Sequence, residues 1–278
     1  MDEPLLRFLV FIAILVAMGL LQALFPRRRL QLGYHRWPAN LSLVVVDVVL
    51  VRLLLPAGAV GAALWADQMG FGLMHWLGID VMLALLVSLM LLDLVIYAQH
   101  RVFHAVPLLW RLHRVHHADQ EIDVSTGLRF HPIEILLSML IKIAAVALLG
   151  APVAAVLLFE MLLNGMAMFN HSNVCLPLRL DAALRALVVT PDMHRVHHSV
   201  LPYETNSNFG FNLSIWDRLF GSYVVQPEHG HDGMRIGLNG FQSGHADKLK
   251  DLLYMPFLDS PPVLQQGGDQ DGDNSHQA

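Results

Sequence analysis

The chain has little cysteine and little charge. One cysteine, Cys175, in 278 residues excludes an intrachain disulfide and offers no set of thiolates for structural zinc or for an iron–sulfur cluster. Charged residues make up 15% of the chain, and the formal net charge of −5 is spread out, so nothing indicates nucleic-acid binding. A G-x-G-x-x-G dinucleotide fingerprint is also missing. The sequence therefore shows no electron-transfer module of its own.

Apolar residues, in contrast, are abundant. They form 55% of the sequence, and the mean hydropathy of +0.49 exceeds that of ordinary soluble domains. Each apolar run is long enough to predict a helix that crosses the roughly 30 Å hydrocarbon layer. The runs are Pro4–Phe25, Leu41–Trp65, Val81–Ala98, Ile133–Leu149 and Val153–Phe169. We therefore expect an all-α integral membrane bundle of about four to five transmembrane helices.

The distribution of arginine predicts how this bundle is oriented. Arg27, Arg28, Arg29 and Arg36 follow the first run, which places that end in the cytoplasm and the N-terminus outside. Residues 66–80 hold two Asp and no Lys or Arg, so this loop is expected outside. We expect a first helix with a basic turn (1–36), a membrane domain (37–256) and a disordered cytoplasmic tail (257–278).

Histidines form three dense sets, all predicted at the cytoplasmic ends of the helices. The sets are His100 and His104; His113, His116 and His117; and His194, His197 and His198. Spacings of i, i+3 and i+4 put each set on one side of a helix, so each set is expected to be able to hold one ion. The motif HRVHH occurs twice, as expected if two similar helical segments face a shared site.

Two further histidines stand alone, each at the end of an apolar helix. His131 either ligates a metal or merely leads into a helix that begins at Pro132, and His171 either ligates or reaches for the membrane surface. We expect both to be ligands because the topology returns them to the same side. Eight to ten imidazoles exceed the coordination sphere of one ion, so the sequence predicts two metal ions.

The donor set leaves the kind of metal open, since imidazole suits iron, zinc, copper and nickel. A zinc protease needs the Glu of H-E-x-x-H, but Arg114 and Arg195 occupy that position. A non-redox zinc-binding membrane enzyme stays an alternative. A metal-ion transporter is the other, although its ligands should lie near the membrane midplane on broken helices.

The histidine pattern resembles the fatty acid hydroxylase superfamily, and in particular its bacterial sterol desaturase-like members. The resemblance rests on HRVFH (100–104), HRVHH (113–117), FHP (130–132), NHSN (170–173), HRVHH (194–198) and NFGFNLSIWDRLFGSY (208–223). It implies a bacterial inner-membrane enzyme with a cytosolic helical cap on the membrane helices and two iron ions, for which zinc can substitute, held mainly by His. It also implies O₂-dependent hydroxylation or desaturation of C–H bonds in a lipid such as a sterol or fatty acyl chain.

That chemistry suits the predicted site. An unactivated C–H bond offers no charge for acid–base catalysis, so its oxidation needs a redox metal that makes O₂ a strong oxidant. Because the chain lacks its own electron carrier, electrons from NAD(P)H are expected through a separate reductase with a cytochrome or ferredoxin.

Four residues outside the histidine sets are weaker candidates. Asp93 lies seven positions before His100, two turns along the same helix, so it either orients a liganding imidazole or pairs with Arg52 inside the bundle. Phe209, Phe211 and Trp216 belong to an aromatic segment that fits either an interfacial helix or the wall of a substrate channel.

Overall fold

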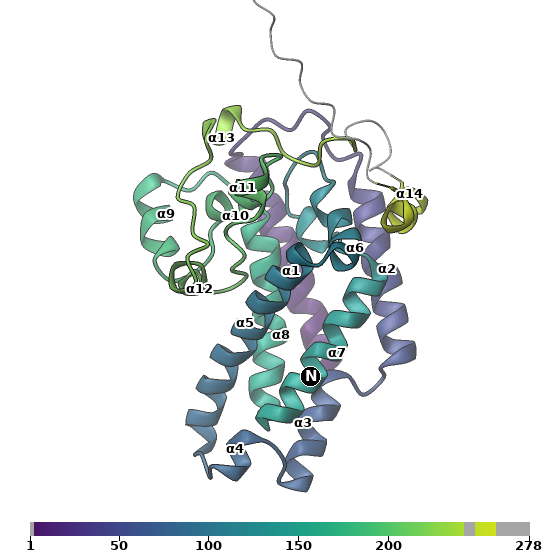
Figure 1. Ribbon diagram of the computed structural model, residues 1–278, viewed down its shortest axis with the longest axis vertical. Helices are drawn as coiled ribbons and strands as arrows, with labels where there is room; N and C mark the ends of the chain where they lie inside the picture. The colour runs from purple at the N-terminus through teal and green to yellow at the C-terminus, as the bar shows by residue number, and fades with distance from the viewer. Residues whose placement is uncertain (1–2, 242–247, 260–278) are drawn as a thin grey trace, which may run out of the picture.

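The computed structural model describes residues 3–241 and 248–259, and all regular secondary structure within these ranges is helical. Long helices form a bundle, and short helices form a cap at one of its ends (Figure 1). The expected fold class is confirmed: five stretches are long and apolar enough to cross a membrane. They comprise α1 (Glu3–Leu24), α2 (Trp37–Leu54) with α3 (Gly58–Met69) and α4 (Leu73–Trp76), α5 (Val81–Ala105), α7 (Pro132–Leu149) and α8 (Val153–Asn170).

The second apolar run is broken, which the hydrophobic pattern alone did not predict. Leu55 leaves the helical conformation at φ −131° and ψ 58°, and Pro56 follows without an N–H to donate. The chain resumes as α3 in the same direction down the bundle (Figure 1). In contrast, α5 continues seven residues past its expected end at Ala98, so both His100 and His104 lie on a regular helix.

The helices that carry the site begin and end at recognisable signals. Pro132 opens α7 at a position where a missing N–H costs nothing, and His131 Nδ1 accepts from Ile133 N at 3.2 Å. Gly150 ends α7 with φ 63°, a left-handed conformation that favours glycine. Thr190 caps α10 (Pro191–His197) by accepting from Met193 N at 3.4 Å. These signals fix where each histidine sits on its helix.

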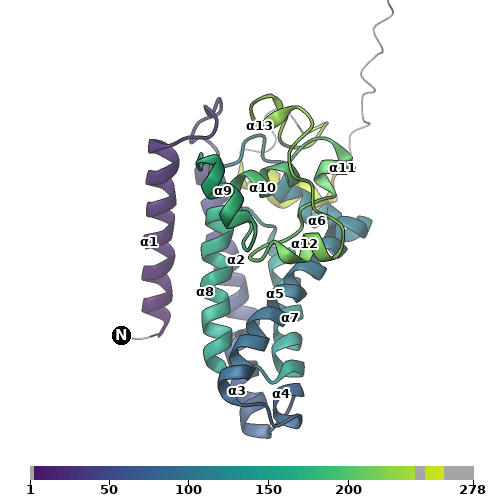
Figure 2. The same ribbon diagram turned by 90° about the vertical axis from the view of Figure 1, so that its left-hand side faces the viewer.

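The bundle core lies where α3, α5, α7 and α8 meet. Ala59, Ala63, Leu92 and Phe159 are among its buried residues, and the small alanines allow close approach of the helices. The first helix stands outside this core and packs against α8 (Figure 2). Large apolar side chains such as Phe8, Val45 and Leu86 are exposed along the helices, as expected where lipid is the solvent.

The cap consists of short helices joined by long loops. They are α6 (Pro107–His117), α9 (Leu178–Arg185), α10, α11 (Pro202–Thr205), α12 (Ile215–Leu219), α13 (Gly230–Gly233), α14 (Leu249–Tyr254) and two 3₁₀ turns, Thr126–Leu128 and Met255–Phe257. Its loops are held by buried polar contacts, while α4 lies at the opposite end of the bundle (Figure 1). The expected tail from residue 257 begins inside the second 3₁₀ turn, and residues 260–278 lie outside the described residues.

A buried ionic cluster joins the cap to the bundle. Arg36, 1% exposed at the start of α2, pairs with Asp119 and with Asp123 at 2.6 Å. Trp37 Nε1 donates to the same Asp123 oxygen at 3.0 Å. The loop after α6 is therefore fixed to the start of α2, in the membrane domain.

Candidate metal centre

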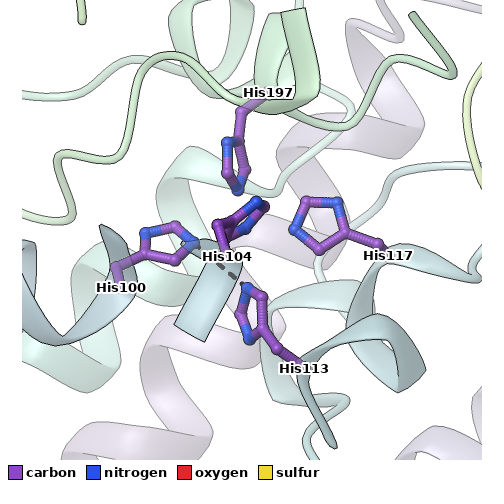
Figure 3. Close-up of side chains that lie close together, drawn as sticks. All are labelled: His100, His104, His113, His117 and His197. Atoms are coloured by element: carbon purple, nitrogen blue, oxygen red, sulfur yellow. Dashed lines mark hydrogen bonds between the residues drawn. The ribbon is translucent and has the colours of Figure 1, made fainter. Parts of the chain in front are cut away.

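Five histidines from three helices converge on one point. His100 and His104 come from α5, His113 and His117 from α6, and His197 from α10. One nitrogen of each ring lies within 4.8 Å of the corresponding nitrogen of every other ring. Figure 3 shows the five rings pointing toward one another, with His100 Nε2 and His113 Nε2 3.1 Å apart. We call these residues the first histidine group.

Four more histidines form the second histidine group beside it. They are His116 from α6, His171 at the end of α8, and His194 and His198 from α10 and its C-terminus. The Nε2 atom of His171 lies 3.0 Å from Nε2 of both His116 and His194. Eight residues of the three sets, together with His171, are thus brought together at the cap end of the bundle.

The division between the groups corrects one expectation. Each HRVHH motif was expected to hold one ion, but each motif supplies ligand atoms to both groups. Adjacent residues of a helix point about 100° apart, so His116 and His117 diverge although both are buried. The two similar segments do face a shared site, with the boundary between the groups running through both of them.

The donor atoms fit metal ions better than they fit hydrogen bonding. Two nitrogens bound at right angles to one ion, each at about 2.1 Å, are about 3.0 Å apart. The shortest separations in both groups are 3.0–3.1 Å. Both ring nitrogens of His117 and of His198, and Nε2 of His197, are buried without a hydrogen-bond partner. Buried polar atoms are rarely left unpaired, so these nitrogens are arranged for a ligand.

Backbone carbonyls hold the rings in one tautomer. Nδ1 donates to a carbonyl oxygen in His100 (Phe209, 2.8 Å), His171 (Ala167, 2.7 Å) and His197 (Ser207, 2.7 Å). A carbonyl only accepts, so the proton lies on Nδ1 and the lone pair lies on Nε2, which faces the other rings. The protein thereby prepares the rings as neutral ligands.

Burial keeps these imidazoles neutral at physiological pH. Desolvation lowers the pKa of His113 and of His171 to about 3, because a buried imidazolium loses its hydration. In the remaining cap histidines of both groups the pKa lies well below its usual value, through burial first and neighbouring histidines second; they are His116, His117, His194, His197 and His198. Neutral imidazole is the form that binds a metal ion.

A carboxylate supports the first histidine group, and the sequence patterns did not identify it. Glu134 Oε1 accepts from His113 Nδ1 at 2.7 Å, and both side chains are buried. A carboxylate that accepts from the outer nitrogen of a liganding histidine fixes the ring and strengthens it as a donor. The available signal was an acidic residue in the first turn of an apolar helix, two positions after Pro132.

Replacing Glu134 with glutamine tests this support. We expect the Glu134→Gln variant to bind metal about 10–100-fold more weakly at the first group, since an amide is a weaker acceptor for the Nδ1 proton of His113. Competition with a coloured chelator measures the affinity. The matched control is Glu228→Gln, an exposed cap residue outside both groups, which should bind as the wild type does. Equal affinity in the two variants would show that Glu134 does not support the ligand.

His131 and Asp93, two of the predicted site residues, lie outside both histidine groups. His131 Nε2 donates to Leu253 O at 3.1 Å while Nδ1 caps α7, so both ring nitrogens are occupied. Asp93 Oδ2 accepts from Leu213 N at 3.1 Å and from Trp216 Nε1 at 2.8 Å. Asp93 thus holds the α12 segment, in contact with neither His100 nor Arg52.

The three aromatic candidates have different surroundings. Phe209 is buried with its ring centroid 5.1–5.6 Å from those of His100, His104 and His197. Trp216 packs beside it over Tyr97, whereas Phe211 packs against the bundle core. Phe209 alone of the three lies directly against the first histidine group, so it is the candidate for contact with a bound substrate.

Gly127 permits the second histidine group to form. A Cβ atom at Gly127 would lie 2.3 Å from Ala167 O and 3.1 Å from His171 Nδ1. Ala167 O is the acceptor that fixes His171, so the 3₁₀ turn must approach α8 at this point with no side chain. Glycine is required here for close approach rather than for its backbone conformation.

Comparisons with known proteins agree with this geometry. Residues 85–222 match the fatty acid hydroxylase family. Ornithine lipid hydroxylase OlsE of Rhizobium tropici is 31% identical over 186 residues, which cover 66% of this chain and 51% of that protein. Alkylglycerol monooxygenase is 31% identical in Xenopus tropicalis and 30% in Homo sapiens, each over 147 residues that cover 52% of this chain and 32% of the relative.

The chain thus spans about half the length of the ornithine lipid hydroxylase and about a third of the two alkylglycerol monooxygenases. No solved structure matches it significantly. These relatives are lipid hydroxylases and monooxygenases by name, and the aligned family segment includes all nine residues of the two histidine groups. With that segment as its histidine-bearing core, the chain fits the fatty acid hydroxylase superfamily.

Proposed function

We propose that this protein is a membrane-bound di-iron oxygenase that hydroxylates a C–H bond of a polar lipid. The observation that carries the proposal is the pair of buried, neutral histidine groups at the cap end of an apolar bundle. Substrate carbon chains lie in the bilayer, and they can approach a site at the end of such a bundle without entering water. The names of the relatives, an ornithine lipid hydroxylase and alkylglycerol monooxygenases, favour hydroxylation over desaturation.

Iron supplies the redox chemistry that this reaction needs, whereas zinc has no accessible redox change. In the balanced reaction, the lipid C–H, O₂, two electrons and two protons give the lipid alcohol and water. The electrons come from NAD(P)H through a separate reductase, since the chain has no cysteine set or nucleotide fingerprint of its own.

The residues of the chain hold and shield this site. The first histidine group would hold one iron and the second group the other, with the rings oriented by the carbonyls of Phe209, Ala167 and Ser207. Glu134 keeps the outer nitrogen of His113 hydrogen-bonded. The ring of Phe209 provides an apolar surface that excludes water beside the first group.

The position of the ligands supports an enzyme rather than a metal-ion transporter. The nine residues lie at the cap end of the long helices, and α5 is unbroken where it carries His100 and His104. A transport site would be expected near the midplane, on interrupted helices. The basic residues that follow α1 support a cytoplasmic cap with the N-terminus outside. The relative from Rhizobium tropici favours a bacterial inner membrane.

Metal content and turnover test the proposal together. We expect protein purified without oxygen to hold close to two iron ions per chain. With a reductase, NADPH and O₂ it should convert ornithine lipid or an alkylglycerol into a product with one added oxygen atom, detected by mass spectrometry. Boiled protein and reactions without O₂ are the controls. Full occupancy by zinc, with no O₂ uptake on any lipid after iron loading, would contradict an oxygenase.

A further inference from the structure

A second polar site lies on the side of α10 that faces away from the histidines. It is a cavity of about 310 Å³ between the turn after α1, the loop after α6 and the segment after α13. The turn after α1 and α13 lie close together at the top of the cap in both views (Figures 1 and 2). Arg28 Nη1 donates to Met234 O at 3.0 Å, which fixes one wall to the other.

The cavity carries a large excess of positive charge. Four arginines line it, and Glu121 is its one acidic lining residue; the arginines are Arg28, Arg29, Arg195 and Arg235. The carboxylate of Glu121 is already engaged, since it accepts from Gln31 N and from Leu32 N at 3.2 Å and lies 3.8 Å from Arg36. Little negative charge is left to neutralise the arginines.

Arg195 makes this a built site rather than a patch of surface arginines. It is 1% exposed, its Nη2 donates to Asn173 Oδ1 at 3.3 Å, and its Nε has no hydrogen-bond partner. Its nearest carboxylate, Asp192 at 3.7 Å, also pairs with Arg27 at 3.2 Å and His231 at 3.6 Å. A buried guanidinium that shares one distant carboxylate is poorly compensated, and a bound anion would complete its pairing.

The two exposed arginines point to the same kind of ligand. Arg29 and Arg235 have no carboxylate partner within the part of the chain that the structure describes. Arg29 lies five residues after Leu24, the end of the first membrane-spanning helix, so it follows a membrane boundary closely in the chain. Guanidinium groups bind phosphate oxygens in pairs, and basic pockets close to a membrane boundary bind lipid headgroups.

We propose that this cavity binds a phosphate-bearing group, with Arg29 and Arg235 at its mouth and Arg195 at its floor. The group comes either from an anionic phospholipid or from a small phosphate in solution, because both present the same oxygens. This proposal stands independently of the reaction proposed above. Since Arg195 follows His194 on α10, a bound phosphate would also brace the helix that supplies both histidine groups.

Binding to the detergent-solubilised full chain tests the proposal. The probes are inorganic phosphate, dioleoylphosphatidic acid and dioleoylglycerol, which has the same acyl chains without phosphate; retention of the lipids is followed by native mass spectrometry and the thermal midpoint by scanning fluorimetry. We expect phosphatidic acid or phosphate to bind and to raise the midpoint, and dioleoylglycerol to do neither. Loss of the lipid on adding inorganic phosphate identifies a small-phosphate site, and retention identifies a headgroup site.

Variants at the mouth of the cavity provide the decisive comparison. The Arg29→Gln/Arg235→Gln variant should bind the phosphate-bearing probe about 30-fold more weakly, at about 1 kcal/mol per arginine. The control, Arg179→Gln, removes an exposed arginine on α9 outside the cavity and should bind normally. The single variants Arg29→Gln and Arg235→Gln serve if the double variant does not fold, which its metal content reports. Equal binding by mouth and control variants, or binding of polyglutamate but of neither phosphate probe, would overturn the proposal.

Discussion

Replacing His198 with alanine is expected to remove the metal ion from the second histidine group and to abolish lipid oxidation. His198 is buried, and both of its ring nitrogens are free of hydrogen-bond partners, so its contribution there is to the ligand set. Removal of an outer hydrogen-bond partner costs about 10–100-fold in metal affinity or activity, and removal of a ligand should cost more. Metal analysis should show about one ion per chain in place of two, with product formation below detection.

His131, which lies outside both groups, supplies the matched control. His131→Asn keeps a residue that caps α7 well, and it removes an imidazole whose nitrogens are occupied by Ile133 N and Leu253 O. This variant should retain both metal ions and most of the activity. If His131→Asn loses a metal ion while His198→Ala retains both, then His131 is a ligand, His198 is not, and the two histidine groups do not define the metal sites.

Replacing Arg36 with methionine should cause the largest loss of stability. The substitution leaves Asp119 and Asp123 buried beside an apolar side chain, without the guanidinium that pairs with both. Breaking a buried ion pair by removing one partner costs about 3–5 kcal/mol. We expect the thermal midpoint in detergent to fall markedly, measured by the change in tryptophan fluorescence, whereas Arg179→Met on the cap surface should leave it unchanged.

A second substitution separates lost charge pairing from lost packing. Arg36→Met/Asp123→Asn removes one of the orphaned carboxylates and should recover part of the stability. If the double variant is as unstable as the sum of its single changes, the interaction between these two side chains is not what stabilises the cap.

The same ionic cluster contributes to the response of the cap to acid. Burial alone would raise the pKa of Asp119, but Arg36 and Arg129 lower the pKa below its usual value. A carboxyl with a depressed pKa stabilises the fold above its ordinary pKa of about 3.9, and this contribution is lost as the pH falls through the folded value. The stabilisation that Asp119 itself contributes should therefore persist down to about pH 4.

Much of the fold and most of the ligand set could be predicted from the sequence because both are local patterns. Apolar length defined the spans, and i, i+3, i+4 spacing put the histidines of α6 and α10 on the buried sides of their helices. The division into two groups was missed, because spacing fixes the direction of a ring relative to its own helix. It does not say which neighbouring ring lies nearest.

The residues that sequence reasoning missed or misplaced depend on contacts far apart in the chain. Glu134 reaches His113 across two helices, and Arg36 reaches Asp119 over more than 80 positions. Asp93 lies about two helical turns before His100, but its carboxylate accepts hydrogen bonds from two N–H groups of the α12 segment instead. His131 Nε2 likewise donates to the backbone carbonyl of Leu253 in α14. In each case the segment that packs against the helix determined which partner the side chain bonds.

Two helices, α6 and α10, each supply histidines to both groups, so the positions of the two groups are linked. Helix α6 supplies His113 and His117 to the first group and His116 to the second, whereas α10 with its C-terminal residue supplies His197 to the first and His194 and His198 to the second. Docking these two helices around a single ion therefore also assembles three of the four imidazoles that await the next one. We expect occupancy of one position to preorganise its neighbour, so wild-type protein that holds a single ion should be scarce, and the two helices fix the spacing between the two groups.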